Sequence, residues 1–398
     1  MSEILQLVDS VVPEITEVWQ TIHHNPELSM QEYNTAALLE SKLREMEGIE
    51  RIHRVGETGL WVEIVGLLPG DEDNILMLRG DMDALPIQEA DNGLPYRSQN
   101  PGVMHGCGHD VHCSSLLGSV KVLLNYRDRF SGRIWFFFQP GEEAAAGAKT
   151  FVEDPEIDLT KMRACGAVHV LGFTEVGKVC LKSGEHLACP DRLFFTVHGK
   201  SAHASTPSHT IDALGAAVDL VVMLRNLVAR ETDPTDNVLF RISRFVAEPK
   251  NGSICETVEV GGSLSTFNPK VRQRLLDSIQ RMVDAVSLST NAQIDFHYVN
   301  RVPALINDPK MTAMAARAIT KALGEDAVEM ADRPAMAAED FALFTQYAPG
   351  VHMSIGCRNP GEAPVPAHCP QFYTHPGAIR VGITALVAYA LEYFGVDY

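Results

Sequence analysis

Residues 104–112 hold a dense group of potential metal ligands. Five side chains in this segment can donate to a cation, namely His105, Cys107, His109, Asp110 and His112. Such a density of imidazole, thiol and carboxylate groups is typical of a transition-metal site. An apolar run at 116–124 predicts a helix that begins close to the cluster, and a helix N-terminus stabilises a thiolate. The alternative, a structural thiol beside a capping histidine, leaves this density unexplained.

An acidic pair, Glu142 and Glu143, follows a Gln-Pro-Gly turn at the end of another apolar run. Taken alone, an exposed acidic pair at a helix start is the commoner explanation, because carboxylates are stabilised there. Beside a metal, however, two adjacent carboxylates can divide the chemistry: one binds the cation while the other transfers protons. The neighbouring ligand cluster therefore favours a catalytic pair.

Four further histidines are candidates for the same site. His169 lies in an apolar segment, where a buried core histidine is the usual alternative, but its expected place at a strand end favours a ligand role. His203 falls in a part of the chain that predicts a separate domain, so spacing alone favours a surface histidine. His368 and His375 compete for one late ligand position, and spacing does not choose between them.

The elements that must position these residues are predicted strands. Apolar runs alternate with helical segments, as expected for a largely parallel α/β sheet, at 60–68, 74–84, 133–143 and 164–172. Several polar residues lie toward the C-terminal ends of these runs: Asp81, Asp83, Glu142, Glu143 and His169. Open α/β sheets bind ligands at that edge. We therefore expect these side chains to converge there with Cys107 and His109.

A chain of 398 residues predicts more than one domain. From about residue 186 the pattern becomes strand–helix–strand–strand–helix–strand, which is typical of a ferredoxin-like unit. Its elements are expected at 192–200, 210–230, 237–246, 256–267, 269–287 and 292–300. We predict a metal-binding catalytic domain made of residues 1–185 and 300–398, into which residues 186–299 are inserted.

Composition excludes several classes of function. The formal net charge of −18 and the lack of a basic block argue against nucleic acids and anionic membranes as partners. No apolar run approaches the roughly 20 residues of a membrane span, and the acidic N-terminus is unlike a signal peptide. The eight cysteines are scattered, which favours reduced thiols and a cytoplasmic protein.

Together these motifs resemble the M20-type metallopeptidases, in particular their amidohydrolase branch of aminoacylases, hippurate hydrolases, auxin-conjugate hydrolases and N-acetyl-diaminopimelate deacetylases. The resemblance covers nearly the whole chain. It rests on the segments HHNPELSMQE (23–32), RGDMDALP (79–86), HGCGHDVHCSSLLG (105–118), FQPGEEAAAGA (138–148), GKSAHASTP (199–207), AAEDF (337–341) and HCPQF (368–372). The HGCGHD segment followed by the Glu pair is highly specific.

The resemblance implies two divalent metal ions bridged by Cys107, with four further ligands: His109, Glu143, His169 and His368. His368 is preferred to His375 because it alone fits the family's His-x-Pro-x-Phe pattern. Glu142 would be the general base, and His203 would polarise the scissile carbonyl from an inserted domain that serves as a lid and dimerisation domain. Three carboxylates would orient the ligand imidazoles: Asp81, Asp83 and Asp110.

Three positions in the predicted inserted domain depart from the branch. Ser208 stands where a histidine is common, although His209 is adjacent; the region around Asn251 lacks the usual Asn-Val-Ile-Pro; and segment 262–267 has serine where arginine is common. Because the family handles the substrate carboxylate and the dimer contact in this domain, the departures bear on the substrate rather than on the chemistry.

We therefore expect a cytoplasmic, metal-dependent amidohydrolase that cleaves the amide bond of N-acyl amino acids and forms a homodimer. A dipeptidase, aminopeptidase or carboxypeptidase with the same site is the main alternative. A metal-dependent sensor would lack a base, whereas Glu142 and Glu143 are both present, and a structural zinc module would need ligands close together in sequence. Zinc suits the thiol and imidazoles, and the carboxylates also admit manganese, cobalt or nickel.

Overall fold

The computed structural model describes residues 2–248 and 253–398, so Asn251 lies outside the described residues. The chain forms two compact units. The first contains the residues up to His186 together with Ile306–Pro334 and Asp340–Tyr398, and the second contains Leu187–Leu305 and Ala335–Glu339. Across the described ranges, no helix has both the length and the apolar character needed to span a bilayer.

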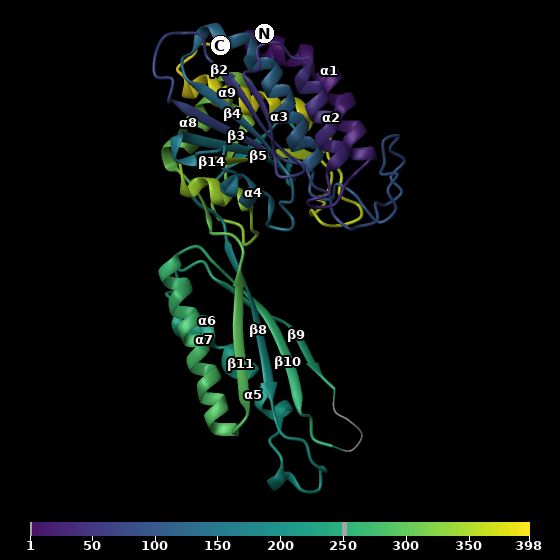
Figure 1. The fold of residues 1–398 in the computed structure, drawn as a ribbon, viewed down its shortest axis with the longest axis vertical. Helices are drawn as coiled ribbons and strands as arrows, with labels where there is room; N and C mark the ends of the chain where they lie inside the picture. The colour runs from purple at the N-terminus through teal and green to yellow at the C-terminus, as the bar shows by residue number, and fades with distance from the viewer. Residues whose placement is uncertain (1, 249–252) are drawn as a thin grey trace. The chain divides into compact units, whose positions relative to one another are not determined.

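An eight-stranded sheet forms the centre of the first unit (Figure 1). Its strands, in the order in which they lie in the sheet, are β1 (Arg51–Val55), β2 (Gly59–Val65), β4 (Arg133–Gln139), β3 (Ile75–Asp81), β5 (Met162–Glu175), β14 (Gly350–Arg358), β6 (Val179–Leu181) and β13 (Val328–Met330). The central strands β4, β3, β5 and β14 are parallel, which confirms the predicted largely parallel α/β sheet. Strand β2 is antiparallel to both of its neighbours.

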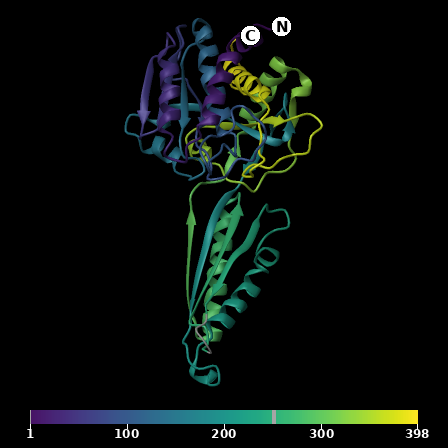
Figure 2. The same ribbon diagram turned by 90° about the vertical axis from the view of Figure 1, so that its right-hand side faces the viewer.

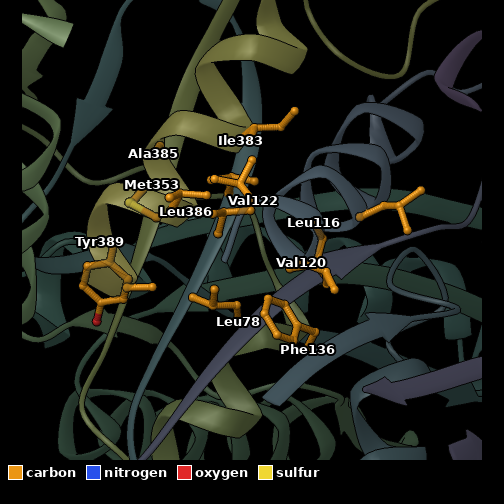
Figure 3. Close-up of a cluster of buried hydrophobic side chains, with 14 of the residues drawn as sticks. Leu78, Leu116, Val120, Val122, Phe136, Met353, Ile383, Ala385, Leu386 and Tyr389 are labelled. Atoms are coloured by element: carbon orange, nitrogen blue, oxygen red, sulfur yellow. The ribbon is translucent and has the colours of Figure 1, made fainter. Parts of the chain in front are cut away.

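Helices cover the sheet. They are α1 (Glu3–His24), α2 (Tyr33–Arg44), α3 (His109–Leu123), α4 (Gly147–Glu153), α8 (Pro309–Leu323) and α9 (Gly377–Tyr393). Side chains on α3 and α9 pack against strand residues such as Leu78 and Phe136 in the main core (Figure 3). Because side chains alternate along a strand, Phe137 of β4 faces the other way and stacks on Phe151 of α4. The central strands are therefore buried on both faces, which explains their unbroken apolar character.

The C-terminal ends of β3, β4 and β5 meet at one edge of the sheet. Asp81 is the last residue of β3, and β4 ends at Gln139, just before the acidic pair. His169 differs from the expectation, because β5 continues to Glu175 and the histidine lies inside the strand. The pairing of β3 with β5 nevertheless ends at Ala167, so His169 lies just beyond the edge that β3 forms.

The second unit has the ferredoxin-like order predicted from the sequence. Its elements are β8 (Cys189–His198), α5 (Ala213–Leu224), α6 (Leu227–Glu231), β9 (Leu239–Ala247), β10 (Thr257–Thr266), α7 (Pro269–Thr290) and β11 (Gln293–Asn300). The antiparallel sheet has the order β11-β8-β10-β9, and α5 and α7 pack on one face of it (Figure 2). Alternate residues of β8 face these helices and form a separate core with Leu220 and Leu275. Two short strands, β7 (Gly184–Leu187) and β12 (Leu305–Asn307), pair with each other.

Candidate metal centre

The turn that precedes α3 positions the first two candidate ligands. Helix α3 begins at His109, which confirms that the histidine- and cysteine-rich cluster leads into a helix. Gly108 has a φ angle of 81°, a conformation that only glycine adopts readily, and a Cβ atom there would collide with the side chain of Val170. The glycine thus lets the turn approach β5 closely, and it places Cys107 near His169.

Five side chains of the first unit bring their donor atoms together. Cys107 Sγ lies 3.5 Å from His169 Nε2, and His368 Nε2 lies 3.0 Å from Glu143 Oε1. His109 Nε2 is 4.0 Å from the same carboxylate oxygen. Two groups of donor atoms, each within 4.8 Å, overlap at the sulfur of Cys107; they are Cys107–His109–His169 and Cys107–Glu143–His368. A shared thiol with a separate set of donors on each side would suit a pair of divalent ions.

The local bonds of the histidines leave suitable nitrogen atoms for a cation. His169 Nδ1 bonds the carbonyl oxygen of Val170 at 2.7 Å, which directs Nε2 toward Cys107. His109 Nε2 is buried and forms no hydrogen bond within the described residues. Of the two late histidines, His368 lies beside the carboxylate of Glu143 and shares a group of donor atoms with it. His375 belongs to no such group among the described residues, and its Nδ1 accepts from the Gly377 N–H at the start of α9.

The electrostatics around Cys107 also suit a cation. Burial raises the pKa of this thiol to about 12, although the adjacent His109 acts in the opposite direction. A thiolate therefore needs a strong positive charge beside it, which a divalent ion supplies because coordination deprotonates a thiol. Sulfur, imidazole and carboxylate donors together form a set that divalent transition metals accept. The residues present thus fit two divalent metal ions.

The carboxylate of Asp83 connects a candidate ligand with the acidic pair. Its Oδ1 lies 3.0 Å from His109 Nδ1 and accepts from the Glu142 N–H at 3.1 Å. Its Oδ2 accepts from the Glu143 N–H at 3.0 Å and from Ser29 Oγ at 2.6 Å. Although burial disfavours its charge, the bond with His109 holds the pKa of Asp83 below its usual range. One carboxylate thus fixes an imidazole and the backbone of both glutamates.

Asp81 belongs to a fully buried polar network beside the ligands. It accepts from Arg79 Nη1 at 2.7 Å and lies 2.6 Å from His112 Nδ1. His112 Nε2 in turn accepts from the Val170 N–H at 2.7 Å, so the ring nitrogens of His112 already have partners. Arg79 also donates to Asp340 Oδ1 at 2.9 Å. Sequence reasoning missed Arg79 and Asp340, although both lie in segments that carry the family resemblance.

Asp110 holds residues of α1. Its Oδ2 accepts from Trp19 Nε1 at 2.7 Å and lies 2.7 Å from His23 Nδ1. Neither partner is one of the expected ligands, so Asp110 holds α1 rather than a ligand imidazole. Burial lowers the pKa of His23, but Asp110 and Glu89 outweigh this effect and raise it to about 9.

The residue expected to transfer protons and the residue expected to bind the substrate carbonyl lie in different units. Glu142 belongs to the first unit, where its carboxylate forms a group of donor atoms with His109 and Glu143. His203 belongs to the second unit, where it is exposed and its Nδ1 lies 2.7 Å from Ser205 Oγ. The side chains of the first unit thus combine cation donors with an adjacent carboxylate, which defines a metal-dependent hydrolase centre.

Comparison with known proteins agrees with this class. Residues 77–392 match peptidase family M20/M25/M40. An N-acetyl-L-cysteine deacetylase of Bacillus subtilis is 33% identical over 336 residues, which cover 84% of this chain and 78% of the deacetylase. Thermostable carboxypeptidase 2 of Saccharolobus solfataricus is 30% identical over 384 residues, which cover 95% of each chain.

Solved structures agree as well. A dinuclear metal-binding peptidase of the M20 family from Bacillus subtilis superposes with a TM-score of 0.84 at 28% identity, covering 98% of this chain and 100% of that one. This chain therefore belongs to the M20/M25/M40 peptidase family and hydrolyses amide bonds. The resemblance drawn from the motifs is confirmed, and the family relationship and the clustered donors support two divalent metal ions.

Proposed function

We propose that this protein removes the acyl group from N-acyl amino acids by metal-dependent hydrolysis. The observation that carries the proposal is the position of Cys107, whose sulfur belongs to two groups of donor atoms while Glu142 lies in a third group with His109 and Glu143. The similarity to an N-acetyl-L-cysteine deacetylase supports the N-acyl amino acid as the substrate class.

In this proposal, four residues complete the metal site around Cys107: His109, Glu143, His169 and His368. When bound, the ions act as Lewis acids and make water acidic enough to lose a proton near neutral pH. Glu142 accepts that proton on its carboxylate, and it then delivers the proton to the nitrogen of the leaving amine. Asp83 holds both the general base and His109 in place, because its carboxylate bonds the backbone of Glu142 and the ring of His109.

We also assign His203 to the carbonyl oxygen of the substrate, as a donor to the negative charge that develops there. Loss of one such donor typically lowers the rate on the order of 100- to 1000-fold. His203→Ala should therefore reduce kcat by this factor while the metal content stays at the wild-type level. An unchanged kcat would remove His203 from the mechanism.

Zinc is the metal that we propose for the working site, because the thiol and the three imidazoles are donors that zinc prefers. The carboxylate of Glu143 also suits manganese, cobalt or nickel. Reconstitution of metal-depleted protein with each ion, followed by activity and stoichiometry measurements, identifies the working metal. Highest activity with another ion at matched occupancy would reject zinc.

A carboxypeptidase is the second candidate, because the similarity to thermostable carboxypeptidase 2 of Saccharolobus solfataricus covers 95% of this chain. The decisive experiment is a substrate panel on metal-reconstituted protein. It contains acetyl, benzoyl and longer acyl amino acids, free dipeptides and N-blocked peptides. We expect kcat/KM to be highest for the acyl amino acids. Preferential cleavage of peptides would favour the carboxypeptidase, and metal binding without any hydrolysis would favour a sensor.

We further propose a cytoplasmic homodimer that associates through the second unit. Helix α5 carries an exposed apolar stripe at helical spacing, formed by Leu214, Val218 and Val222. A charged residue at Val218 should convert the dimer to a monomer in analytical ultracentrifugation, whereas an unchanged molecular mass would reject this face.

The cytoplasmic location is supported by the eight cysteines, all of which are free thiols in the described residues.

A further inference from the structure

Segment 27–32 lies against the elements that carry the candidate site. Leu28 pairs with Ala84 in a parallel bridge, next to Asp83. Ser29, the next residue of the segment, donates its hydroxyl hydrogen to Asp83 Oδ2 at 2.6 Å. The segment therefore contacts the carboxylate that holds the acidic pair.

Glu32 ends this segment, and it uses both of its carboxylate oxygens. Oε1 accepts from the backbone N–H groups of Gly141 and Met30, each at 2.8 Å, while Oε2 accepts from Thr58 Oγ1 at 2.9 Å. The residue is completely buried. Burial raises the pKa of Glu32, and the negative charge of Asp83 acts in the same direction. The three donors thus require an oxygen acceptor at this position, while burial and the neighbouring Asp83 disfavour a negative charge on it.

The bond from Glu32 reaches the N–H of Gly141, the residue directly before Glu142. Gly141 has a φ angle of 60°, and a Cβ atom there would collide with the sulfur of Met30. The carbonyl oxygen of Gly141 accepts from the N–H groups of Ala146 and Gly147, at 3.1 and 3.2 Å, which closes the turn 141–147 on itself. Hydrogen bonds therefore fix Gly141 on both its N–H and its carbonyl side.

We propose that Glu32 is a positioning residue of the reaction, which acts through Gly141 to hold the backbone from which the carboxylate of Glu142 extends. The inference rests on the proposed role of Glu142 as the proton-transferring group. Misplacement of a reacting group by about 1 Å can lower a rate on the order of 100-fold, so a remote hydrogen bond that fixes this backbone affects catalysis strongly.

Two substitutions of Glu32 separate its position from its charge. Glu32→Gln removes the charge but keeps an oxygen at the same reach, so it can still accept from Gly141. Glu32→Asp keeps the charge but shortens the side chain by about 1.5 Å, which withdraws the acceptor from Gly141. If position is what matters, the glutamine variant keeps most of its activity and the aspartate variant loses most of it.

The experiment measures kcat, KM, metal stoichiometry and Tm for the metal-loaded, full-length variants on an N-acyl amino acid. We expect kcat of Glu32→Asp to fall roughly tenfold or more, with KM and metal content at wild-type values, and kcat of Glu32→Gln to stay within about threefold. Should Glu32→Asp fail to fold, Ser29→Ala tests the same segment at its half-buried bond to Asp83 and should lower kcat severalfold.

Gln31→Ala is the matched control, because this neighbouring side chain is exposed and should leave all four measurements unchanged. The proposal is overturned if Glu32→Asp keeps the wild-type kcat, if its kcat falls only in proportion to metal or folded protein, or if Glu32→Gln loses as much activity as Glu32→Asp. Failure of the proposed function appears differently, because wild-type protein would then hydrolyse no N-acyl amino acid.

Discussion

At the scale of single residues, the sulfur of Cys107 is the atom shared by two sets of candidate ligands. We expect Cys107→Ala to lose at least one of the two metal ions and to lose nearly all activity, since the remaining donors no longer share a bridge. Elemental analysis of purified protein measures the metal directly. Cys180→Ala, at a half-buried thiol outside every donor group, is the control. Two bound ions and full activity in Cys107→Ala would exclude the bridging thiolate.

Glu142 and Glu143 should respond differently to the loss of their charge. Glu142→Gln should lower kcat on the order of 100- to 10,000-fold while the metal content stays near wild type, because the base is lost but the ligands remain. Glu143→Gln should weaken metal binding, because its carboxylate lies with Cys107 and His368. Equilibrium dialysis and steady-state kinetics on both variants check this. The reverse outcome would exchange the two roles.

How far sequence could predict the site depends on the residue. Cys107, His109 and Glu143 lie in motifs whose spacing is specific, and the structure brings their donor atoms together. The partners of Asp110 could not be predicted, because Trp19 lies far away in the sequence and nothing local indicates which side of α3 faces α1. Glu32 was missed although it ends the segment 23–32, because nothing local indicates that its side chain bonds Gly141, far away in the sequence.

At the scale of elements, the turn before α3 requires glycine. Gly108→Ala should destabilise the fold by about 1–3 kcal/mol, because it adds left-handed strain and a collision with Val170. Gly102 has a similar φ angle of 77° but open space around it, so Gly102→Ala measures the strain alone. Urea denaturation of both variants yields the difference. Equal losses would show that the close approach to β5 is unimportant.

The strands show what periodicity predicts and what it cannot. The runs around Leu78 and Phe136 predicted buried strands because they are continuously apolar, and both strands are buried. Strand β1 was missed, because Arg51, His53 and Arg54 give it no apolar pattern. The direction of β2 was not predictable either, since strand pairing depends on contacts far apart in sequence.

At the scale of the whole molecule, the pair of His23 with Asp110 ties α1 to α3, and it makes stability depend on pH. The folded-state pKa of His23, about 9, lies above the ordinary value of 6.5. The pair therefore contributes its full stabilisation, on the order of 3 kcal/mol, below about pH 6.5. This contribution is lost as the pH rises through 9.

The difference in unfolding free energy between wild type and His23→Gln, measured from pH 6 to pH 10 at roughly unit intervals, tests this coupling. We expect the difference to shrink toward alkaline pH. A difference that is constant across this range would mean that His23 stabilises the fold through packing alone. His53, a histidine near the surface that pairs with Asp154, supplies a comparison variant.

The order of the strands has a consequence for biosynthesis. Strand β14, residues 350–358, lies between β5 and β6, and the candidate ligand His368 follows it. A nascent chain still leaving the ribosome therefore has an open gap in its sheet and lacks a donor. We expect the ions to be acquired only after translation has ended, so truncated products should retain little metal inside the cell.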